Sequence, residues 1–265
     1  MVGPVVTLTG ELSCEDCREL VGRLPERSVH LTVFSPNYGT IRDGCNASLE
    51  ELVELGGLLR FATVDSGIAC VVIQDQRIDH AQTGDSFRLA AGWLAKGWRL
   101  FTTLIYQRDG RDGPWYRDCP RPDHEYVLVF VNNDSGPPRV FKKDKSTPSK
   151  HAGRYFSGTV RTTAGTMKPI KRKRVNALKC SGTVWKIPPS NTEANPLKMR
   201  HPATFPDRLA GRLIEMFSEP GDVVLDPMMG SGTVPYVARE MGRSYLGGDL
   251  NFDYVELARR RMAVV

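Results

Sequence analysis

The spacing of apolar residues predicts strands that alternate with helices through the first half of the chain. Short apolar runs indicate strands at residues 5–11, 29–34, 67–74, 98–107 and 125–131. Between them, apolar residues at helical spacing indicate helices at residues 14–24, 48–61 and 86–96. The run GIACVVIQ at 67–74 is almost continuously apolar, which is typical of a strand buried on both faces. This alternation predicts an α/β fold with a mainly parallel, doubly wound sheet.

The pattern changes after residue 131. Gly, Pro, Ser, Thr and Lys dominate residues 132–199, and neither the helical nor the strand period persists there. Order returns with an amphipathic helix at 207–217, a short apolar strand ending at Asp226 and a second strand at 243–249. We therefore expect three parts: residues 1–131, a small irregular insertion at 132–199, and residues 200–265.

Composition is that of an ordinary soluble protein. The chain has 265 residues, 40% of them hydrophobic and 25% charged, and no apolar run approaches the roughly 18 residues of a membrane span. The first residues lack the basic start and apolar core of a signal peptide, so we expect a cytoplasmic protein without a membrane segment. Six cysteines form no disulfide framework, and the lone pair Cys14 and Cys17 has no second pair nearby, so no metal site is predicted.

Positive charge is concentrated in the irregular segment. Residues 139–186 contain 14 Lys or Arg and one acid, Asp144, a net +13 in a chain whose total is +6. A basic segment on an acidic remainder predicts a polyanionic partner, most simply nucleic acid, although a disordered basic linker would have the same composition. The candidate DNA-binding residues are Lys142, Lys143, Arg154, Arg161, Lys171, Arg172, Lys173 and Arg174.

A glycine turn follows the strand that ends at Asp226. The sequence DVVLDPMMGSGT at 222–233 reads as strand, turn and helix, and Gly230 and Gly232 allow the backbone to approach a ligand closely. No lysine follows the glycines, which disfavours a phosphate-binding loop, and Asp249 lies where an acid can accept two ribose hydroxyls. The residues alone leave a dinucleotide, S-adenosyl-L-methionine or a plain tight turn open.

This segment resembles the cofactor motif of amino-methylating DNA methyltransferases, D-P-F-x-G-S-G-T, with Met228 in place of Phe. The resemblance implies S-adenosyl-L-methionine as cofactor, with Asp226 facing its ammonium, Ser231 and Thr233 its carboxylate, and Asp249 its ribose. It also implies that Glu11 lies beside the adenine and that residues 201–206 close over the methionine end. The full set of implied cofactor contacts is Glu11, His201, Ala203, Thr204, Phe205, Asp226, Pro227, Met228, Gly230, Ser231, Gly232, Thr233 and Asp249.

A second motif, Ser35-Pro36-Asn37-Tyr38, comes directly after the strand at 29–34. It resembles the S-P-P-Y motif of N4-cytosine DNA methyltransferases, whereas D-P-P-Y or N-P-P-Y mostly accompanies methylation of adenine N6. An exocyclic amine is a poor nucleophile, and the Ser35 hydroxyl and Pro36 carbonyl can accept its two hydrogens while Tyr38 stacks on a flipped base. Asn37 departs from the family's second proline and adds hydrogen-bond donors to the turn.

The two motifs stand in an unusual order, because SPNY precedes the glycine turn by about 190 residues. Reading the chain as a circle restores the usual methyltransferase order, so the sequence resembles the permuted β group of these enzymes. The resemblance implies a Rossmann-like sheet, circularly permuted, with a basic target-recognition insertion that binds double-stranded DNA.

The resulting hypothesis is a site-specific N4-cytosine DNA methyltransferase. Adenine N6 methylation by the same fold and an inactive DNA-binding relative remain alternatives, whereas a carbon-5 enzyme would need a Pro-Cys turn and the chain has only Cys119-Pro120. The recognition sequence, a partner restriction endonuclease and the choice between monomer and homodimer are not readable from the residues.

Overall fold

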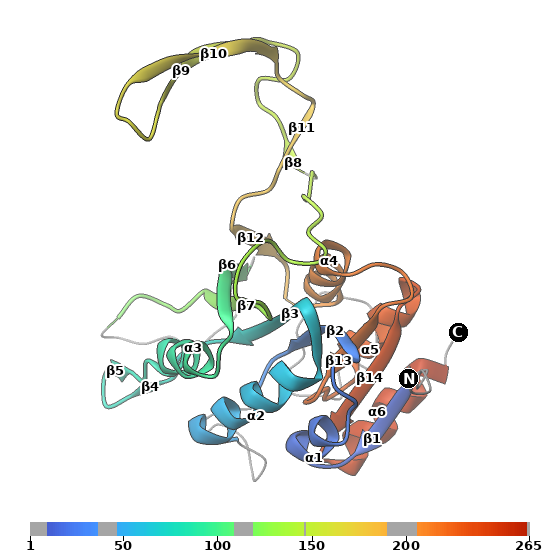
Figure 1. The fold of residues 1–265 in the computed structure, drawn as a ribbon. Helices are drawn as coiled ribbons and strands as arrows, with labels where there is room; N and C mark the ends of the chain where they lie inside the picture. Colours follow the sequence, from blue (N-terminus) through green and yellow to red (C-terminus); the bar gives the residue numbers. More distant parts are fainter. Residues whose placement is uncertain (1–9, 37–46, 109–118, 146, 190–205, 264–265) are drawn as a thin grey trace. The chain divides into compact units, whose positions relative to one another are not determined.

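An eight-stranded sheet forms the centre of the molecule. The computed structural model describes residues 10–36, 47–108, 119–145, 147–189 and 206–263 (Figure 1). Across the sheet the strands are β1 (Glu11–Cys14), β14 (Ser244–Asp249), β13 (Val223–Asp226), β2 (Val29–Phe34), β3 (Thr63–Ile73), β7 (His124–Val131), β6 (Arg99–Arg108) and β12 (Val184–Ile187). The first five run parallel, and of the eight only β7 runs in the opposite direction.

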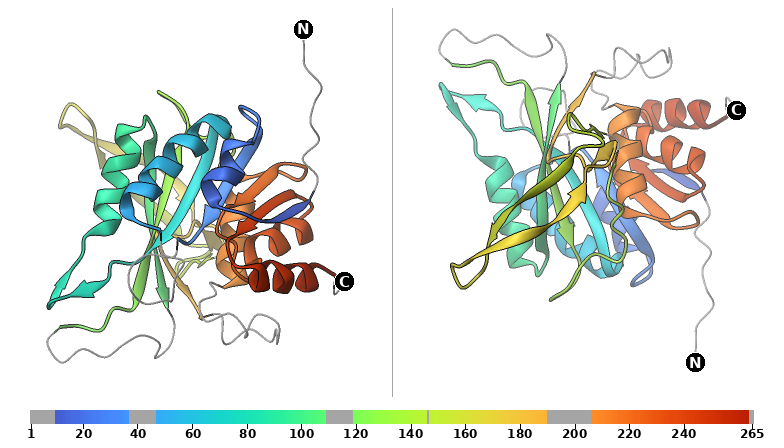
Figure 2. Two further views of the ribbon diagram at one scale, coloured as in Figure 1. Left: turned by 90° about the horizontal axis from the view of Figure 1, so that it is seen from below. Right: turned by 90° about the horizontal axis from the view of Figure 1, so that it is seen from above.

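Helices cover both faces of this sheet (Figure 2). One face carries α1 (Cys17–Gly22), α2 (Leu49–Ala62) and α3 (Asp85–Ala95), and the other carries α4 (Asp207–Phe217) and α5 (Thr233–Glu240), with α6 (Phe252–Ala263) beside β1 and β14. Strand β3 shows why both layers form, because its alternate residues belong to different clusters. Ile68, Cys70 and Val72 lie in the α4–α5 core, whereas Ala69, Val71 and Ile73 lie in the α1–α3 core. The predicted doubly wound α/β fold is confirmed.

The sheet order differs from the chain order at one place that matters for the site. β13 lies between β14 and β2, although β2 and β13 are separated by most of the sequence. Leu225 of β13 pairs in parallel with Thr32 of β2. The glycine turn after β13 and the SPNY segment after β2 therefore follow neighbouring strands.

The first predicted helix begins later than expected. The strand β1 continues to Cys14, which pairs with Asp249, and the α1 helix begins at Cys17. The Asp16 side chain caps it by accepting a hydrogen bond from the Arg18 amide at 2.8 Å. Asp16, the third residue of the expected helix, is therefore the residue that caps α1, and the helix begins at Cys17.

The chain divides into two compact units, Lys143–Gly182 and the rest, which we call the basic unit and the main unit. The basic unit contains the hairpin β9 (Tyr155–Arg161) and β10 (Met167–Arg174), and the short pair β8 (Thr147–Pro148) and β11 (Leu178–Lys179). The range 132–199 thus has more regular structure than the sequence indicated. Apolar alternation reports a buried face, and these strands are almost wholly exposed on both faces.

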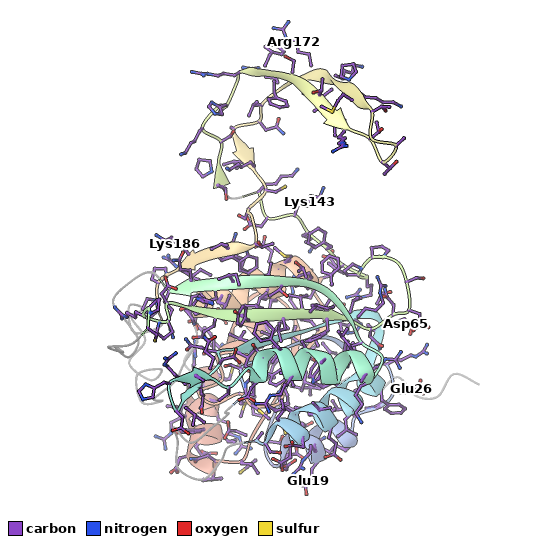
Figure 3. The ribbon with its side chains drawn as sticks, turned by 90° about the vertical axis from the view of Figure 1, so that its left-hand side faces the viewer. Glu19, Glu26, Asp65, Lys143, Arg172 and Lys186 are labelled. Atoms are coloured by element: carbon purple, nitrogen blue, oxygen red, sulfur yellow. The ribbon has the colours of Figure 1, made fainter. Side chains whose placement is uncertain are left out.

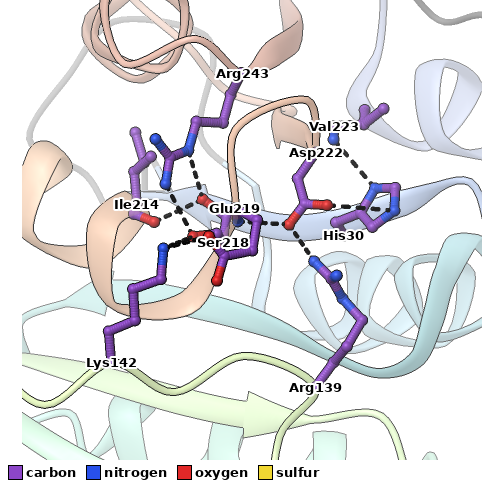
Figure 4. Close-up of polar contacts among 9 residues, drawn as sticks. All are labelled: His30, Arg139, Lys142, Ile214, Ser218, Glu219, Asp222, Val223 and Arg243. Atoms are coloured by element: carbon purple, nitrogen blue, oxygen red, sulfur yellow. Dashed lines mark hydrogen bonds and ion pairs between the residues drawn. The ribbon is translucent and has the colours of Figure 1, made fainter.

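A polar network within the main unit holds Arg139 and Lys142, which lie just before the basic unit in the chain (Figure 4). Arg139 pairs with Asp222 and Lys142 with Glu219, and the Lys142 ammonium also donates to the Ser218 carbonyl at 3.2 Å. Arg243 donates to the same carbonyl at 2.9 Å. Residues 139–142 are therefore held beside the amino end of β13.

Candidate active site and nucleic-acid interface

Four parallel strands end at one edge of the sheet and bring most of the predicted site residues there. Asp226 is the last residue of β13, Asp249 is the last residue of β14, and Ser35 directly follows β2. Strand β1 ends beside Asp249. Ligands of open α/β sheets bind at the carboxyl ends of the strands, so this edge is the candidate active site.

The glycine turn forms the floor of this site. Gly230 and Gly232 have φ values of 49° and 73°, in the left-handed region that favours glycine. Gly232 also precedes the first residue of α5, and a Cβ on it would lie 2.7 Å from the Cβ of Ala258 in α6. Both the backbone conformation and the packing therefore exclude a side chain at Gly232. The turn is buried and leads directly into the start of α5.

Asp249 fixes this turn to the end of β14. Its Oδ2 accepts a hydrogen bond from the Gly230 amide at 2.9 Å, and its Oδ1 accepts one from the Asn251 amide at 2.9 Å. Burial raises the pKa of Asp249, while these two amides oppose the shift. Each carboxylate oxygen keeps one further lone pair, so Asp249 can accept ligand hydroxyls while holding the turn.

Asp226 is the most deeply buried carboxyl group at this edge, with 1% of its surface exposed. Burial raises its pKa well above the usual range, and the nearby Asp249 charge adds to the rise. The Met228 amide donates to Asp226 Oδ1 at 3.1 Å and acts in the opposite direction. A carboxyl group held in this way gains most from a cationic ligand, because the cation supplies the countercharge that burial removed.

A buried arginine that the sequence did not single out supports the start of α5. Arg261 of α6 is 2% exposed and donates from Nη1 to the Thr233 hydroxyl at 3.1 Å and from Nη2 to Asp207 of α4 at 2.7 Å. Its guanidinium carbon lies 4.5 Å from the centre of the Tyr236 ring. In the sequence it is one of three consecutive arginines, and only its burial distinguishes it from its neighbours.

Not all predicted site residues come to this edge or lie within the described residues. Ser35 is half-buried and Pro36 is buried, whereas Asn37, Tyr38, His201, Ala203, Thr204 and Phe205 lie outside the described residues. Pro227, Met228, Ser231 and Thr233 lie in or next to the glycine turn, and Ser231 and Thr233 are 2% and 3% exposed.

Glu11 is not brought to this edge. It is the first residue of β1, pairs in register with Leu246, and forms an ion pair with Arg23. The strand begins, rather than ends, at Glu11, which places the residue toward the amino edge of the sheet. Two acids, Glu15 and Asp16, follow the carboxyl end of β1. Glu15 pairs with Arg23, as Glu11 does, whereas the pKa of Asp16 is lowered by its hydrogen bonds and ion pair with Arg18. The sequence could identify the acids at this edge only if it predicted the last residue of β1 correctly, and the predicted strand ended at residue 11 instead of Cys14.

The candidate nucleic-acid interface is the basic unit. Its Lys143, Arg154, Arg161 and the run 171–174 are exposed, and Arg172 lies with its guanidinium carbon 4.4 Å from the centre of the Tyr155 ring (Figure 3). Lys142 differs, because its ion pair with Glu219 in the main unit already uses its charge. The structure therefore leaves all of the predicted DNA-binding residues except Lys142 available to a partner.

The described part of the chain shows neither a metal-binding cluster nor a membrane-spanning helix. Within it, no group of three or more His, Cys, Asp or Glu is placed to hold a metal ion. None of the helices described is both long and apolar enough to cross a membrane. The five described cysteines are free thiols, as expected, and Cys45 lies outside the described residues.

The chain is similar in sequence to known DNA methyltransferases. Residues 29–260 match the model of the N6/N4 family described as DNA methylase. The chain is 29% identical over 244 residues to the orphan methyltransferase M.BamHII of Bacillus amyloliquefaciens, covering 89% of each protein. It is 27% identical to the type II methyltransferase M.SmaI of Serratia marcescens, covering 93% of this chain and 88% of the relative.

Solved structures show the same fold. TTHA0409 from Thermus thermophilus, described as a DNA modification methylase and solved with S-adenosyl-L-methionine, superimposes with a TM-score of 0.67 and 26% identity over 96% of this chain and 93% of that one. The cytosine-N4-specific PvuII DNA methyltransferase superimposes with a TM-score of 0.71 over 96% of this chain and 86% of that one. At 20% identity, the second likeness concerns the fold alone.

Proposed function

The chain belongs to the N6/N4 DNA methylase family, and on that premise we propose that it methylates the exocyclic N4 amine of cytosine at a specific site in double-stranded DNA. As a member of this family it is a DNA methyltransferase that uses S-adenosyl-L-methionine. The choice of cytosine N4 over adenine N6 is the proposal, and the observation that carries it is a serine, Ser35, at the position where the adenine-type motifs have Asp or Asn. This residue follows β2, directly beside the strand that ends in Asp226.

The residues of the edge fit S-adenosyl-L-methionine. Asp226 offers a buried carboxyl group for the ammonium, and the side-chain-free turn at Gly230 and Gly232 accommodates the methionine part. We assign the cofactor's carboxylate to Ser231 and Thr233, with the Thr233 hydroxyl held by Arg261 at 3.1 Å. Asp249 accepts the ribose hydroxyls, and Asp16 rather than Glu11 is the acid at the edge for the adenine.

The cofactor supplies an electrophilic methyl group on a sulfonium, and the chain's task is to prepare the amine that attacks it. Ser35 Oγ and the Pro36 carbonyl accept the two amine hydrogens and turn the nitrogen lone pair away from the ring. As the new N–C bond forms and the methyl–sulfur bond breaks, one amine proton leaves toward Ser35 and on to solvent. Tyr38 supplies a face for the flipped base.

The strand order supports a circularly permuted origin for this arrangement. Starting at β13 and passing through β14 and α6, the path continues into β1, which pairs with β14 in the sheet, and then into β2. That path visits the cofactor turn before the SPNY segment. We therefore propose that residues 1–131 and 200–265 form the two halves of one methyltransferase domain and that residues 132–199 supply target recognition.

Replacing Ser35 by alanine tests the mechanism. We expect Ser35→Ala to lower single-turnover methylation about 10²- to 10³-fold, since one preorganised hydrogen bond at the reacting centre is lost, and to leave cofactor affinity unchanged. Ser28→Ala is the matched control, because it removes a hydroxyl just before the other end of β2, where Ser28 donates to the Pro25 carbonyl at 2.7 Å. Wild-type turnover in the Ser35 variant would show that SPNY is not the catalytic turn.

Sequencing that distinguishes modified bases tests the choice of target. DNA from cells that express the protein should carry N4-methylcytosine in one sequence context. N6-methyladenine in its place would favour the adenine alternative, and unmodified DNA together with an absence of cofactor binding would favour an inactive relative.

A further inference from the structure

The pairing of β9 with β10 separates the side chains of the hairpin onto two chemically different faces. Residues opposite one another in an antiparallel pair share a face, and successive residues alternate. Arg161 lies opposite Met167 and Tyr155 opposite Arg174, and along β9 these two positions share a face with Ser157 and Thr159. Arg172 joins this face, because its guanidinium carbon lies 4.4 Å from the centre of the Tyr155 ring. We call this the arginine face.

The opposite face has different chemistry. Phe156 lies opposite Lys173, Val160 opposite Lys168, and Gly158 opposite Ile170. Its cations are lysines and its remaining side chains are apolar, so we call it the lysine face. All three arginines of the hairpin therefore share one face, where Lys171 opposite Ser157 also lies, whereas Lys168 and Lys173 lie on the other. The two basic residue types are not equivalent. Arginine presents a rigid planar fork of donors, whereas lysine presents a single mobile point charge.

A bulge in β10 places Arg174 on the arginine face, opposite Tyr155. Two residues of β10, Lys171 and Arg172, stand opposite the single residue Ser157, and the pairing resumes at Lys173 and Phe156. If β10 alternated regularly from Lys168 to Arg174, with no bulge, Arg174 would lie on the same face as Lys168 and Ile170. The insertion therefore returns Arg174 to the face that carries Arg161 and Tyr155.

The hairpin lacks a covering layer within its own unit. Its large apolar side chains are mostly open to solvent, with Tyr155 63%, Phe156 57%, Val160 52% and Met167 60% exposed. An isolated two-stranded hairpin is marginally stable in water, which points to a partner that completes it. The basic unit has 11 Lys or Arg and one acid, so charge complementarity favours a polyanion over a second copy of the same basic surface.

The shape of the hairpin favours double-stranded DNA among the possible polyanions. A two-stranded ribbon fits the major groove of B-form DNA, where each base pair shows a distinct set of donors and acceptors. Arginine pairs in two-point fashion with O6 and N7 of guanine, and Ser and Thr pair with several bases. From Tyr155 to Arg161 the arginine face is about 20 Å long at the usual rise per strand residue, which is about six base-pair steps.

We propose that the β9–β10 hairpin enters the major groove of the target DNA as a ribbon and reads guanine in the recognition sequence through its arginine face. This inference rests on the proposed function, because it takes DNA as the substrate. Arg161 and Arg174 are the specificity-determining residues, with Arg172 preoriented by Tyr155. Lys168 and Lys173 on the lysine face contact phosphates and carry no sequence information.

A substrate analogue and a conservative variant together test this reading. The probe is a duplex with the methylated motif in which single guanines are replaced by 7-deazaguanine, which lacks the N7 acceptor of the major groove. Inosine at the same position is the control, since it keeps N7 and O6 and loses only the minor-groove amine. For the wild-type protein we expect 7-deazaguanine to weaken binding about 5- to 100-fold at one or more guanines and inosine to leave it nearly unchanged.

The variants Arg161→Lys and Arg174→Lys keep the charge and remove the fork. We expect each to bind the normal motif about 5- to 100-fold more weakly while losing the response to 7-deazaguanine at one position. Lys168→Ala and Lys173→Ala, on the other face, should weaken specific and unrelated duplexes alike and lower the salt dependence of binding. Circular dichroism and cofactor affinity report whether each variant is folded.

The outcomes separate this inference from the function on which it rests. Methylation of a defined motif, with insensitivity to 7-deazaguanine at every guanine, overturns the arginine-face reading and leaves the methyltransferase assignment intact. Equal loss of specificity in the Arg161→Lys and Lys168→Ala variants would show that the two faces do not differ in role. Absence of any methylation by the wild-type protein removes the premise itself.

Discussion

At the scale of single residues, the two carboxyl groups of the site show why its chemistry is only partly readable from the sequence. The glycine-turn motif predicted both Asp226 and Asp249 as site residues, and both lie at the carboxyl edge. The motif could not show that Asp249 binds the Gly230 amide, nor that burial raises the pKa of both groups. Glu11 shows the opposite case, since it begins strand β1 rather than ending it, and its predicted contact with the adenine stays a prediction.

Burial of Asp226 makes a testable prediction about stability and pH. The pKa of Asp226 is raised in the folded protein, so the folded state holds its proton more tightly than the unfolded state. The free energy of unfolding therefore falls as the pH rises from the pKa of the unfolded state, about 4, toward that of the folded state. Asp226→Asn removes that loss, while its amide oxygen can still accept from Met228. We expect the cofactor-free variant to be more stable than wild type at neutral pH, by about 1 kcal/mol or more, and to bind S-adenosyl-L-methionine more weakly.

Thermal denaturation at pH 5 and pH 8 and calorimetric titration measure these two effects. The stability difference between variant and wild type should be larger at pH 8, because the unfolded carboxyl group is ionised there whereas burial opposes ionisation in the folded protein. Asp253→Asn in α6 is the control, since Asp253 is exposed. A variant that is less stable than wild type at both pH values would contradict the assignment of a burial penalty to Asp226.

At the scale of elements, close packing between α2 and α3 depends on two glycines. A Cβ on Gly56 would lie 2.5 Å from Nε1 of Trp93, and a Cβ on Gly92 would lie 2.4 Å from Cγ2 of Val53. The Trp93 indole donates to the Leu52 carbonyl at 2.9 Å, and the Trp98 indole donates to the Gly56 carbonyl at 2.7 Å. The helical spacing of apolar residues predicted both helices. How closely the helices approach depends on Gly56 and Gly92, which have no side chain.

Alanine at Gly56 should therefore displace Trp93 and break its hydrogen bond. We expect Gly56→Ala to lower the free energy of unfolding by about 1–3 kcal/mol, the usual cost of overpacking a core. Gly57→Ala is a matched control in the same helix, because its Cβ would lie 3.6 Å from the flexible Lys96 side chain. That variant should gain up to about 1 kcal/mol from helix propensity. Urea denaturation followed by tryptophan fluorescence measures both, and equal effects at the two positions would refute the packing argument.

Elements without a buried face were the ones the sequence concealed. The sheet strands and long helices were predicted because burial imposes a period on their residues. The exposed strands β9 and β10 impose none, and β12 is four residues long, so the range 132–199 read as irregular. Charge, which does not depend on a period, was the one property of that range that the sequence reported correctly.

At the scale of the whole molecule, the first and last segments of the chain pack against each other in the sheet. Strand β1 pairs with β14 along its full length, Arg259 of α6 donates to the Leu12 carbonyl of β1 at 3.0 Å, and a Cβ on Gly248 would lie 2.6 Å from Leu20 of α1. These contacts are those expected between consecutive elements. Nothing in the packing of the described residues at this seam requires that the chain begin there.

We therefore predict that the protein tolerates a new start. In a permuted chain that begins at residue 190 and continues from residue 265 into residue 1, the 12 residues 264–265 and 1–10 connect α6 to β1 and can span up to about 40 Å. Because every strand pair of the sheet is preserved, the permuted protein should bind S-adenosyl-L-methionine within about threefold of wild type and methylate the same motif. A chain opened between Leu225 and Asp226 is the control, since that break separates the buried carboxyl group from the strand that positions it, and it should lose cofactor binding. If the first chain folds, as judged by circular dichroism, but binds the cofactor more than about tenfold more weakly, the covalent order of the halves contributes to the site beyond the contacts seen in the sheet.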